Sequence, residues 1–305
     1  MRRIVAALFV LSLSCGGGRT EGTLSAAASI PGNGGGNSGH GEVDLDGTPD
    51  LVVRSDMLGG QWMVRDETFD ADACSVVEGG VQPGDHRVIR FTVGVANIGD
   101  ADVFIGDPNA HFTPYGDPNG ESDGLFEFAS CHHHFHFKNY TTYQLIDPAT
   151  GKTWRAAKRG FCMLDTDPNP AWLGEPARAK IFDNCGAWGV PGYQGISHGW
   201  TDTYRFFLGG QYFVLDGGDG QEVVPPGRYT LRITANPPFK GGKGAACPFK
   251  DPNGFCHTLR ESNYDNNVAE VTLDIPAHPG RSGVGPAVGQ PEPTSKEEKE
   301  RCGEK

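Results

Sequence analysis

The sequence has little positive charge, no long apolar run after its first residues, and no segment of a dozen residues with a clear helical period. Lys and Arg number 26 against 38 Asp and Glu, which gives a formal net charge of −12. Such a charge disfavours phosphate backbones and anionic membranes, so we expect no nucleic-acid partner and favour cationic ones. Aromatic residues make up 10% of the chain, which is enough apolar material for a real core.

The first residues have the pattern of an export signal. Two arginines precede the apolar run 4–13, which is too short to span a bilayer. We therefore expect residues 1–15 to be a signal peptide and the mature protein to work outside the cytoplasm. Ser14-Cys15-Gly16 resembles a bacterial lipoprotein processing site, which would anchor the protein to the outside of the cell envelope through lipid on Cys15. Plain secretion is the alternative.

Composition divides the rest of the chain into three parts. Residues 16–47 are rich in Gly, Ser and Ala and are expected to form a disordered tether. Residues 278–305 are rich in Pro and Gly and then charged, so we expect a disordered tail. The segment between them, residues 48–277, is predicted to be a single domain.

Short runs of apolar and β-branched residues alternate with turn signals in this central segment. The sequence Asp-Pro-Asn occurs four times, and proline at the second position of a turn fixes its φ angle. These patterns predict an all-β protein, an antiparallel β-sandwich-like single domain with long loops and little helix. The runs are residues 51–53, 88–98, 135–146, 203–215, 228–235 and 268–275.

Eight cysteines are disulfide candidates in an exported protein. Cys247 and Cys256 bracket a loop rich in Pro and Gly and could pair locally. If Cys15 carries lipid, seven cysteines remain, so at least one stays free or pairs elsewhere. Spacing alone does not give the connectivity.

The chemistry-bearing residues are concentrated in Cys131-His132-His133-His134-Phe135-His136. Side chains alternate between the two faces of a strand, so His132, His134 and His136 are predicted to share one face. Three imidazoles can converge on one ion if the strand bends, and such sets suit copper, zinc, iron or nickel. The sequence therefore predicts a metal site at this strand.

Five segments in order resemble the lysyl oxidase family, from about residue 49 to residue 275. The histidines stand in Ser130-Cys131-His132-X-His134-X-His136, which is similar to the family's copper motif. The others are Lys158-Arg-Gly-Phe161-Cys162-X-X-Asp165, Gln194-Gly195-Ile196-Ser197 with Asp202-Thr203-Tyr204, Pro226-Gly227-Arg-Tyr229-X-Leu231 with Asn236-Pro237, and Glu261-Ser-Asn263-Tyr264-Asp265-Asn266-Asn267.

The resemblance implies a copper-dependent amine oxidase. Copper would be held by the three histidines, and Lys158 and Tyr204 would form the self-derived cofactor lysine tyrosylquinone. A primary amine or a protein-lysine side chain would react with O₂ and become an aldehyde, with release of H₂O₂ and ammonia. Asp202, two residues from Tyr204, is the candidate for the base that takes the substrate proton.

The resemblance also implies a calcium site and a disulfide. The calcium ligands would be Asp50, the carbonyl of Leu51, Glu261, Asn263, Asn266 and Asn267, and oxygen ligands of these types suit calcium. Asx-rich turns without metal are the alternative interpretation. Cys131 is expected to pair with Cys185, which leaves Cys74 and Cys162 as the next candidate pair.

Two other functions fit part of the sequence. A non-catalytic extracellular copper-binding β-sandwich, such as an adhesin or metal carrier, would take up metal without oxidising amines. A zinc hydrolase with three histidine ligands and an open water position is the third hypothesis. It ranks last because the chain has no evident αβ pattern.

Overall fold

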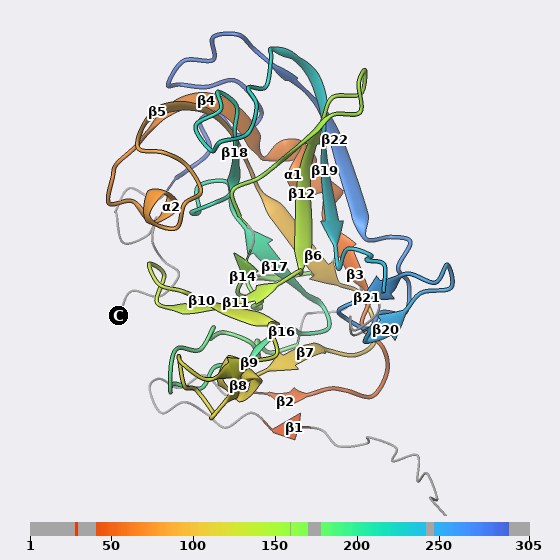
Figure 1. Cartoon of the computed structure of the whole chain (residues 1–305). Helices are drawn as coiled ribbons and strands as arrows, with labels where there is room; N and C mark the ends of the chain where they lie inside the picture. The colour runs from red at the N-terminus through yellow and green to blue at the C-terminus, as the bar shows by residue number, and fades with distance from the viewer. Residues whose placement is uncertain (1–27, 30–40, 159, 170–177, 242–246, 293–305) are drawn as a thin grey trace, which may run out of the picture.

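The computed structural model describes residues 28–29, 41–158, 160–169, 178–241 and 247–292 (Figure 1). Every strand pair in these residues is antiparallel, and helix is confined to α1 (Ser55–Gly60), α2 (Cys74–Val77) and the 3-10 turn η1 (Pro108–His111). This confirms the predicted all-β fold with little helix. No described helix has the length and apolar character needed to cross a membrane.

Two four-stranded sheets carry much of the core. The first has the order β13 (Thr153–Arg155), β12 (Thr141–Ile146), β19 (Gly227–Ala235) and β22 (Val268–Ile275). The second has the order β15 (Asp167–Pro168), β17 (Trp200–Tyr204), β6 (Val93–Asn97) and β3 (Leu51–Val53). Alternate residues of β19 face inward, with Leu231 and Ile233 fully buried, as strand periodicity requires.

Smaller sheets surround these two. One three-stranded sheet has the order β10 (Phe126–Ala129), β11 (His134–Lys138) and β14 (Gly160–Phe161). Another has the order β18 (Tyr212–Val214), β5 (Gly84–Phe91) and β4 (Trp62–Phe69). The two-stranded sheets are β16 (Gln194–Ile196) with β7 (Val103–Gly106), β1 (Ala28–Ser29) with β2 (Glu42–Val43), β8 (Phe112–Thr113) with β9 (Glu121–Ser122), and β20 (Phe249–Lys250) with β21 (Cys256–His257).

Three predicted strands are each divided in two by a change of direction. The run 88–98 becomes β5 and β6, and the run 203–215 becomes the end of β17 and β18. The run 135–146 breaks at Asn139, whose φ of 60° lies in the left-handed region that asparagine tolerates. These breaks let consecutive strands enter different sheets, which alternation of apolar residues alone does not reveal.

The folded part extends beyond the predicted segment 48–277 at both ends. The side chain of Val43 is fully buried with Ile181 and Phe182, although residues 16–47 were predicted to be a disordered tether. Residues 278–292 pack along β4, where Val64 and Val284 exchange backbone hydrogen bonds of 2.8 Å and Ala287 is fully buried. The predicted disordered tail therefore begins too early in the sequence. Residues 1–15, with Cys15, and Cys302 lie outside the described residues.

The disulfides differ from two of the predicted pairs. Cys247 pairs with Cys256 as predicted, but Cys131 pairs with Cys74 and Cys185 pairs with Cys162. The buried amide of Gln194 explains the second pair, because it accepts the N–H of Met163 and donates to the carbonyl of Cys185. The predicted pairs Cys131–Cys185 and Cys74–Cys162 are therefore wrong. Both observed bridges join segments that the fold brings together over long stretches of sequence.

Candidate metal and cofactor site

The three predicted histidines come together, although only two of them lie in the strand. His134 and His136 are on β11, whereas His132 lies in the preceding turn, and His133 between them has a φ of 56°. The left-handed His133 reverses the chain locally, so simple strand alternation does not place His132. The ring centroids are still only 5.7 Å apart for His132 and His134, 5.6 Å for His132 and His136, and 4.9 Å for His134 and His136.

The donor atoms of this cluster fit a metal ion. The Nε2 atoms of His134 and His136 are 3.1 Å apart. Two nitrogens that bind one metal at about 2.0–2.1 Å lie about 2.8–3.4 Å apart at angles between square-planar and tetrahedral. Burial, the Lys158 ammonium and the other two imidazoles hold the pKa of His136 well below its usual range, so this ring is neutral. A neutral imidazole is the form that binds metal.

The three rings already lie together, but their donor atoms do not yet form a complete coordination shell. In the described part of the chain, no three His, Cys, Asp or Glu side chains already have the arrangement of a formed metal site. Glycines pack closely against the rings, since a Cβ on Gly209 would lie 3.3 Å from Nε2 of His132. A Cβ on Gly160 would lie 2.7 Å from Cβ of His136. The lack of side chains at these two positions therefore allows the close packing around the cluster.

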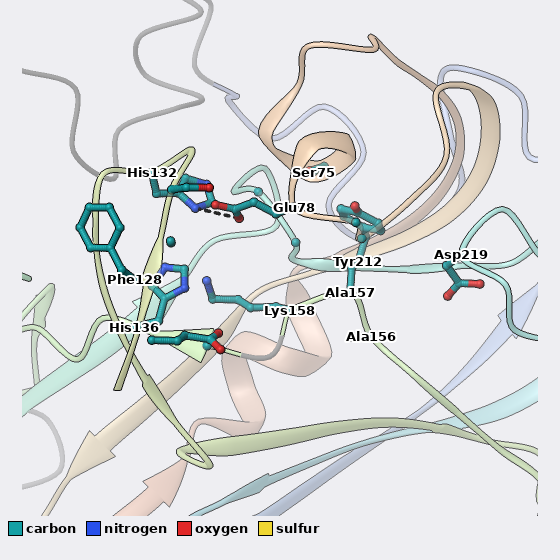
Figure 2. Close-up of a pocket in the computed structure, with 18 residues that line it drawn as sticks. Ser75, Glu78, Phe128, His132, His136, Ala156, Ala157, Lys158, Tyr212 and Asp219 are labelled. Carbon is teal, nitrogen blue, oxygen red and sulfur yellow. Dashed lines mark ion pairs between the residues drawn. The ribbon is translucent and has the colours of Figure 1, made fainter. Parts of the chain in front are cut away.

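Lys158 and Tyr204 also lie together beside the histidines. The Nζ atom of Lys158 is 4.8 Å from the centroid of the Tyr204 ring and 5.2 Å from that of Phe161. The backbone N–H of Lys158 donates to the carbonyl of Gly210 at 2.9 Å, which fixes the start of the side chain. In Figure 2 the Lys158 side chain points toward His136.

The Tyr204 ring is held rigidly in the core. Its hydroxyl donates to the carbonyl of Cys162 at 2.7 Å, and its ring meets Phe161 edge-on at 5.2 Å between centroids. Burial is the main cause that raises the pKa of Tyr204 well above its usual range, and the Asp202 carboxyl adds to it. The phenol is therefore protonated and fixed in orientation.

Asp202 lies on β17 two residues before Tyr204 and is 1% exposed. Burial raises the pKa of its carboxyl well above the ordinary value, although Tyr204 and Lys158 act in the opposite direction. Burial is the main cause that raises the pKa values of Tyr140 and Tyr143, and the charge of this carboxyl adds to it. Asp202 is thus the centre of a buried polar cluster behind the Tyr204 ring.

Two cavities open onto this centre from different sides. The larger has a volume of about 820 Å³ and is lined by His134, His136, Lys158, Asp202 and Tyr204. The smaller, of about 360 Å³, is lined by His132, His136 and Lys158 (Figure 2). Pro291 and Glu292 of the C-terminal segment line the larger cavity, so residues predicted to be a disordered tail form part of its wall.

The residues predicted to hold calcium converge at another place, between β3 and the loop before β22. Glu261 accepts the N–H of Leu51 at 2.7 Å and an amide hydrogen of Asn267 at 2.8 Å. Asn266 donates to the Asp50 carboxylate at 2.9 Å, whereas the Asn263 side chain accepts the N–H of Asp265 in a local turn. The site thus joins distant segments without metal, and calcium binding stays a prediction.

Sequence reasoning missed two buried side chains that organise the site. Gln194 donates to the carbonyl of Phe135 at 2.9 Å and so ties β16 to the histidine strand. Asp165 accepts hydrogen bonds from the N–H groups of Ile181, Phe182 and Ser197 and from the Ser197 hydroxyl. Both residues belong to the motifs quoted above. A polar residue between apolar neighbours in such a motif is a signal for this role, because buried polar side chains usually hydrogen-bond to the backbone.

A third residue, Glu78, gave no signal in the sequence. Its carboxylate lies 3.2 Å from Nδ1 of His132 and comes from a segment more than fifty residues away. No local pattern links such distant positions.

Fold and site together define an all-β protein in which three imidazoles stand beside a lysine–tyrosine pair. The model of the family described as lysyl oxidase matches residues 63–278, more than two thirds of the chain. The chain therefore belongs to the lysyl oxidase family, whose members generally depend on copper and lysine tyrosylquinone. No curated protein matches the sequence.

Proposed function

We propose that the protein is a copper-dependent quinoprotein amine oxidase that converts primary amines to aldehydes with release of H₂O₂ and ammonia. The observation that carries this proposal is the 4.8 Å between the Nζ atom of Lys158 and the Tyr204 ring, next to three imidazoles. The balanced reaction is RCH₂NH₂ + O₂ + H₂O giving RCHO + NH₃ + H₂O₂.

The proposed copper ligands are His132, His134 and His136. Copper, when bound, supplies the one-electron chemistry with O₂ that oxidation of a tyrosine ring requires. The protein contributes a neutral His136, imidazoles that already lie together, and glycines that pack closely against them. Preassembly reduces the ordering that metal binding must impose.

Lys158 and Tyr204 are proposed to be joined covalently as lysine tyrosylquinone. The joined group has a bond between Nζ and a ring carbon, and oxygen at two ring positions. The fixed hydroxyl of Tyr204 and its edge-on contact with Phe161 hold the ring still while the longer lysine side chain approaches. Positioning of this kind contributes to rate because it avoids the entropy of bringing the groups together.

Asp202 is the proposed base for the α-proton of the amine. It lines the larger cavity together with Tyr204 and Lys158, so a substrate bound at the ring would lie near its carboxylate. The substrate class we propose is a cationic primary amine, with peptidyl-lysine side chains as the first members to test. The net charge of −12 favours approach of such cations.

The test uses the full chain loaded with copper in the presence of O₂. Peptide mass spectrometry should recover residues 158 and 204 in one cross-linked species, and amines should trigger peroxide release. Tyr204→Phe and Lys158→Arg should abolish both results. Tyr143→Phe is the matched control, because Tyr143 also packs edge-on against Phe161 but is not proposed to react. Copper uptake with free peptides and no peroxide would instead support a non-catalytic copper carrier.

The proposed location is outside the cell, either secreted or anchored by lipid on Cys15. This rests on the signal pattern of residues 1–15. Mass spectrometry of the mature N-terminus separates the two outcomes, because lipid on Cys15 adds a large apolar mass.

A further inference from the structure

Glu78 contacts the histidine cluster from outside its strand. One carboxylate oxygen, Oε2, lies 3.2 Å from Nδ1 of His132, and the other, Oε1, accepts the backbone N–H of the neighbouring Cys131 at 3.2 Å. Figure 2 shows the Glu78 side chain reaching the His132 ring at the rim of the smaller cavity. The same carboxylate therefore accepts a hydrogen bond from the backbone of the turn and lies within ion-pair distance of the ring, although Nδ1 and Oε2 are not aligned as a hydrogen bond in the metal-free structure.

The position of Glu78 is fixed from two directions. Glu78 follows the short helix α2, and its N–H donates to the carbonyl of Cys74 at 2.9 Å. Cys74 in turn forms the disulfide with Cys131, the residue directly before His132. The helix end and the histidine turn are thus joined by a disulfide and by the hydrogen bond from the Cys131 N–H to Glu78, which keeps the carboxylate beside the ring.

His132 needs outside support more than the other two histidines. His134 and His136 lie on β11, where pairing with β10 fixes the backbone, and they are 4% and 7% exposed. His132 lies in a turn before a left-handed residue, and 14% of its side chain is exposed. Imidazoles that bind metal through one nitrogen usually have the other against a carboxylate, carbonyl or water, which fixes the tautomer and the ring orientation.

We propose that Glu78 is a positioning residue for His132, keeping a proton on Nδ1 so that the Nε2 lone pair is left for the metal. The inference rests on the proposed metal site but not on amine oxidation. Nε2 is the nitrogen beside Gly209, where the missing side chain leaves space.

The first experiment measures the tautomer of His132 in metal-free full-length protein labelled with ¹⁵N in its histidines. Long-range proton–nitrogen spectra should show the Nδ1–H form in the wild type and a mixture of both tautomers in Glu78→Gln. The control is Asp219→Asn, because Asp219 lines the same cavity but lies away from His132 and His136 (Figure 2). It should leave the His132 signals unchanged. Identical tautomers in the wild type and Glu78→Gln would overturn the proposal.

The second experiment measures copper affinity by competition with a chelator. Glu78→Gln should bind copper roughly 10–100-fold more weakly, and Asp219→Asn should stay within about twofold of the wild type. The copper electron paramagnetic resonance spectrum should keep the same set of nitrogen ligands in Glu78→Gln. Unchanged affinity would contradict the proposal, and so would a spectrum that loses an oxygen ligand, since Glu78 would then bind the metal itself.

A second variant separates the proposal from misfolding, and the choice of readouts separates it from the proposed function. If Glu78→Gln misfolds by circular dichroism, Glu78→Asp tests the same point, because it keeps the charge but shortens the reach. Neither readout requires peroxide release, so a protein without amine oxidase activity still tests Glu78. Conversely, if the wild type oxidises amines but Glu78→Gln changes neither the tautomer nor the copper affinity, only the positioning role is overturned.

Discussion

Gly160 and His136 pack so closely that no larger residue fits at position 160. A Cβ built on Gly160 would lie 2.7 Å from Cβ and 2.9 Å from Nδ1 of His136. Atoms at that separation must move apart, and His136 lies on β11, next to β14. The glycine between Lys158 and Phe161 in the motif is therefore a packing requirement of the histidine cluster.

Gly160→Ala should displace the His136 ring and weaken copper binding by about tenfold, with a loss of roughly 1–3 kcal/mol in the free energy of unfolding. Chelator competition and urea unfolding measure the two effects. Gly59→Ala is the control, since a Cβ there meets nothing within 4 Å. Equal copper affinity in the wild type and Gly160→Ala would show that the ring adjusts without cost.

Asp202→Asn should lower turnover by about 10²–10⁴-fold, because an amide cannot take the substrate proton. The cross-link between residues 158 and 204 should still form. Since burial raises the pKa of Asp202, its base form appears only at higher pH than for an ordinary carboxyl. Turnover in the wild type should therefore rise with pH through this raised pKa, which a pH–rate profile measures. An unchanged profile in Asp202→Asn would assign the base to another group.

Replacing the disulfide partners Cys74 and Cys131 with serine should reduce copper affinity as well as stability. This bridge holds Glu78 and α2 against the histidine turn, and loss of a native disulfide costs roughly 2–4 kcal/mol. The matched variant replaces Cys247 and Cys256, whose bridge closes a loop at β20 and β21. It should change stability only. Equal copper affinities in the two double variants would show that the first bridge does not support the site.

The stability of the metal-free protein should fall as pH rises from about 4.5 to about 7. Burial raises the pKa of Glu261 from 4.5 to about 7, so the folded state holds this proton over a range where the unfolded state has lost it. Ionisation in the folded state then costs free energy, on the order of 2–3 kcal/mol for this shift. Urea unfolding at both ends of this range should show the decrease for the wild type and a smaller one for Glu261→Gln. Added calcium should reverse the decrease if it binds here, since it would favour the carboxylate.

Ala287→Asp should destabilise the protein by roughly 3 kcal/mol or more, because it places a charge in a fully buried position beside Met63 and Phe206. The adjacent Val288 is 43% exposed, so Val288→Asp should have little effect. Thermal unfolding of both variants tests whether residues 278–292 belong to the folded domain. Similar melting temperatures for the two variants would show that this segment does not contribute to the folded domain, as the predicted disordered tail would not.

The three histidine rings lie together, but strand alternation accounts for only part of this arrangement. Alternation along a strand accounts for His134 and His136, but His132 reaches the cluster through the left-handed His133. The sequence gives residue types and spacing, and it gives a turn only where a strong signal such as proline or glycine stands. Histidine at a positive φ has no such signal.

The residue types alone established an all-β chain, the imidazole cluster and the membership of Lys158 and Tyr204 in family motifs, because alternation and motif spacing are local properties. Only the tertiary structure decided that Cys74 joins Cys131, that Glu78 faces His132, and that Pro291 and Glu292 line the larger cavity. Each of these depends on contacts between segments tens to hundreds of residues apart. Such contacts are set by the pairing and packing of whole sheets, which local sequence patterns do not encode.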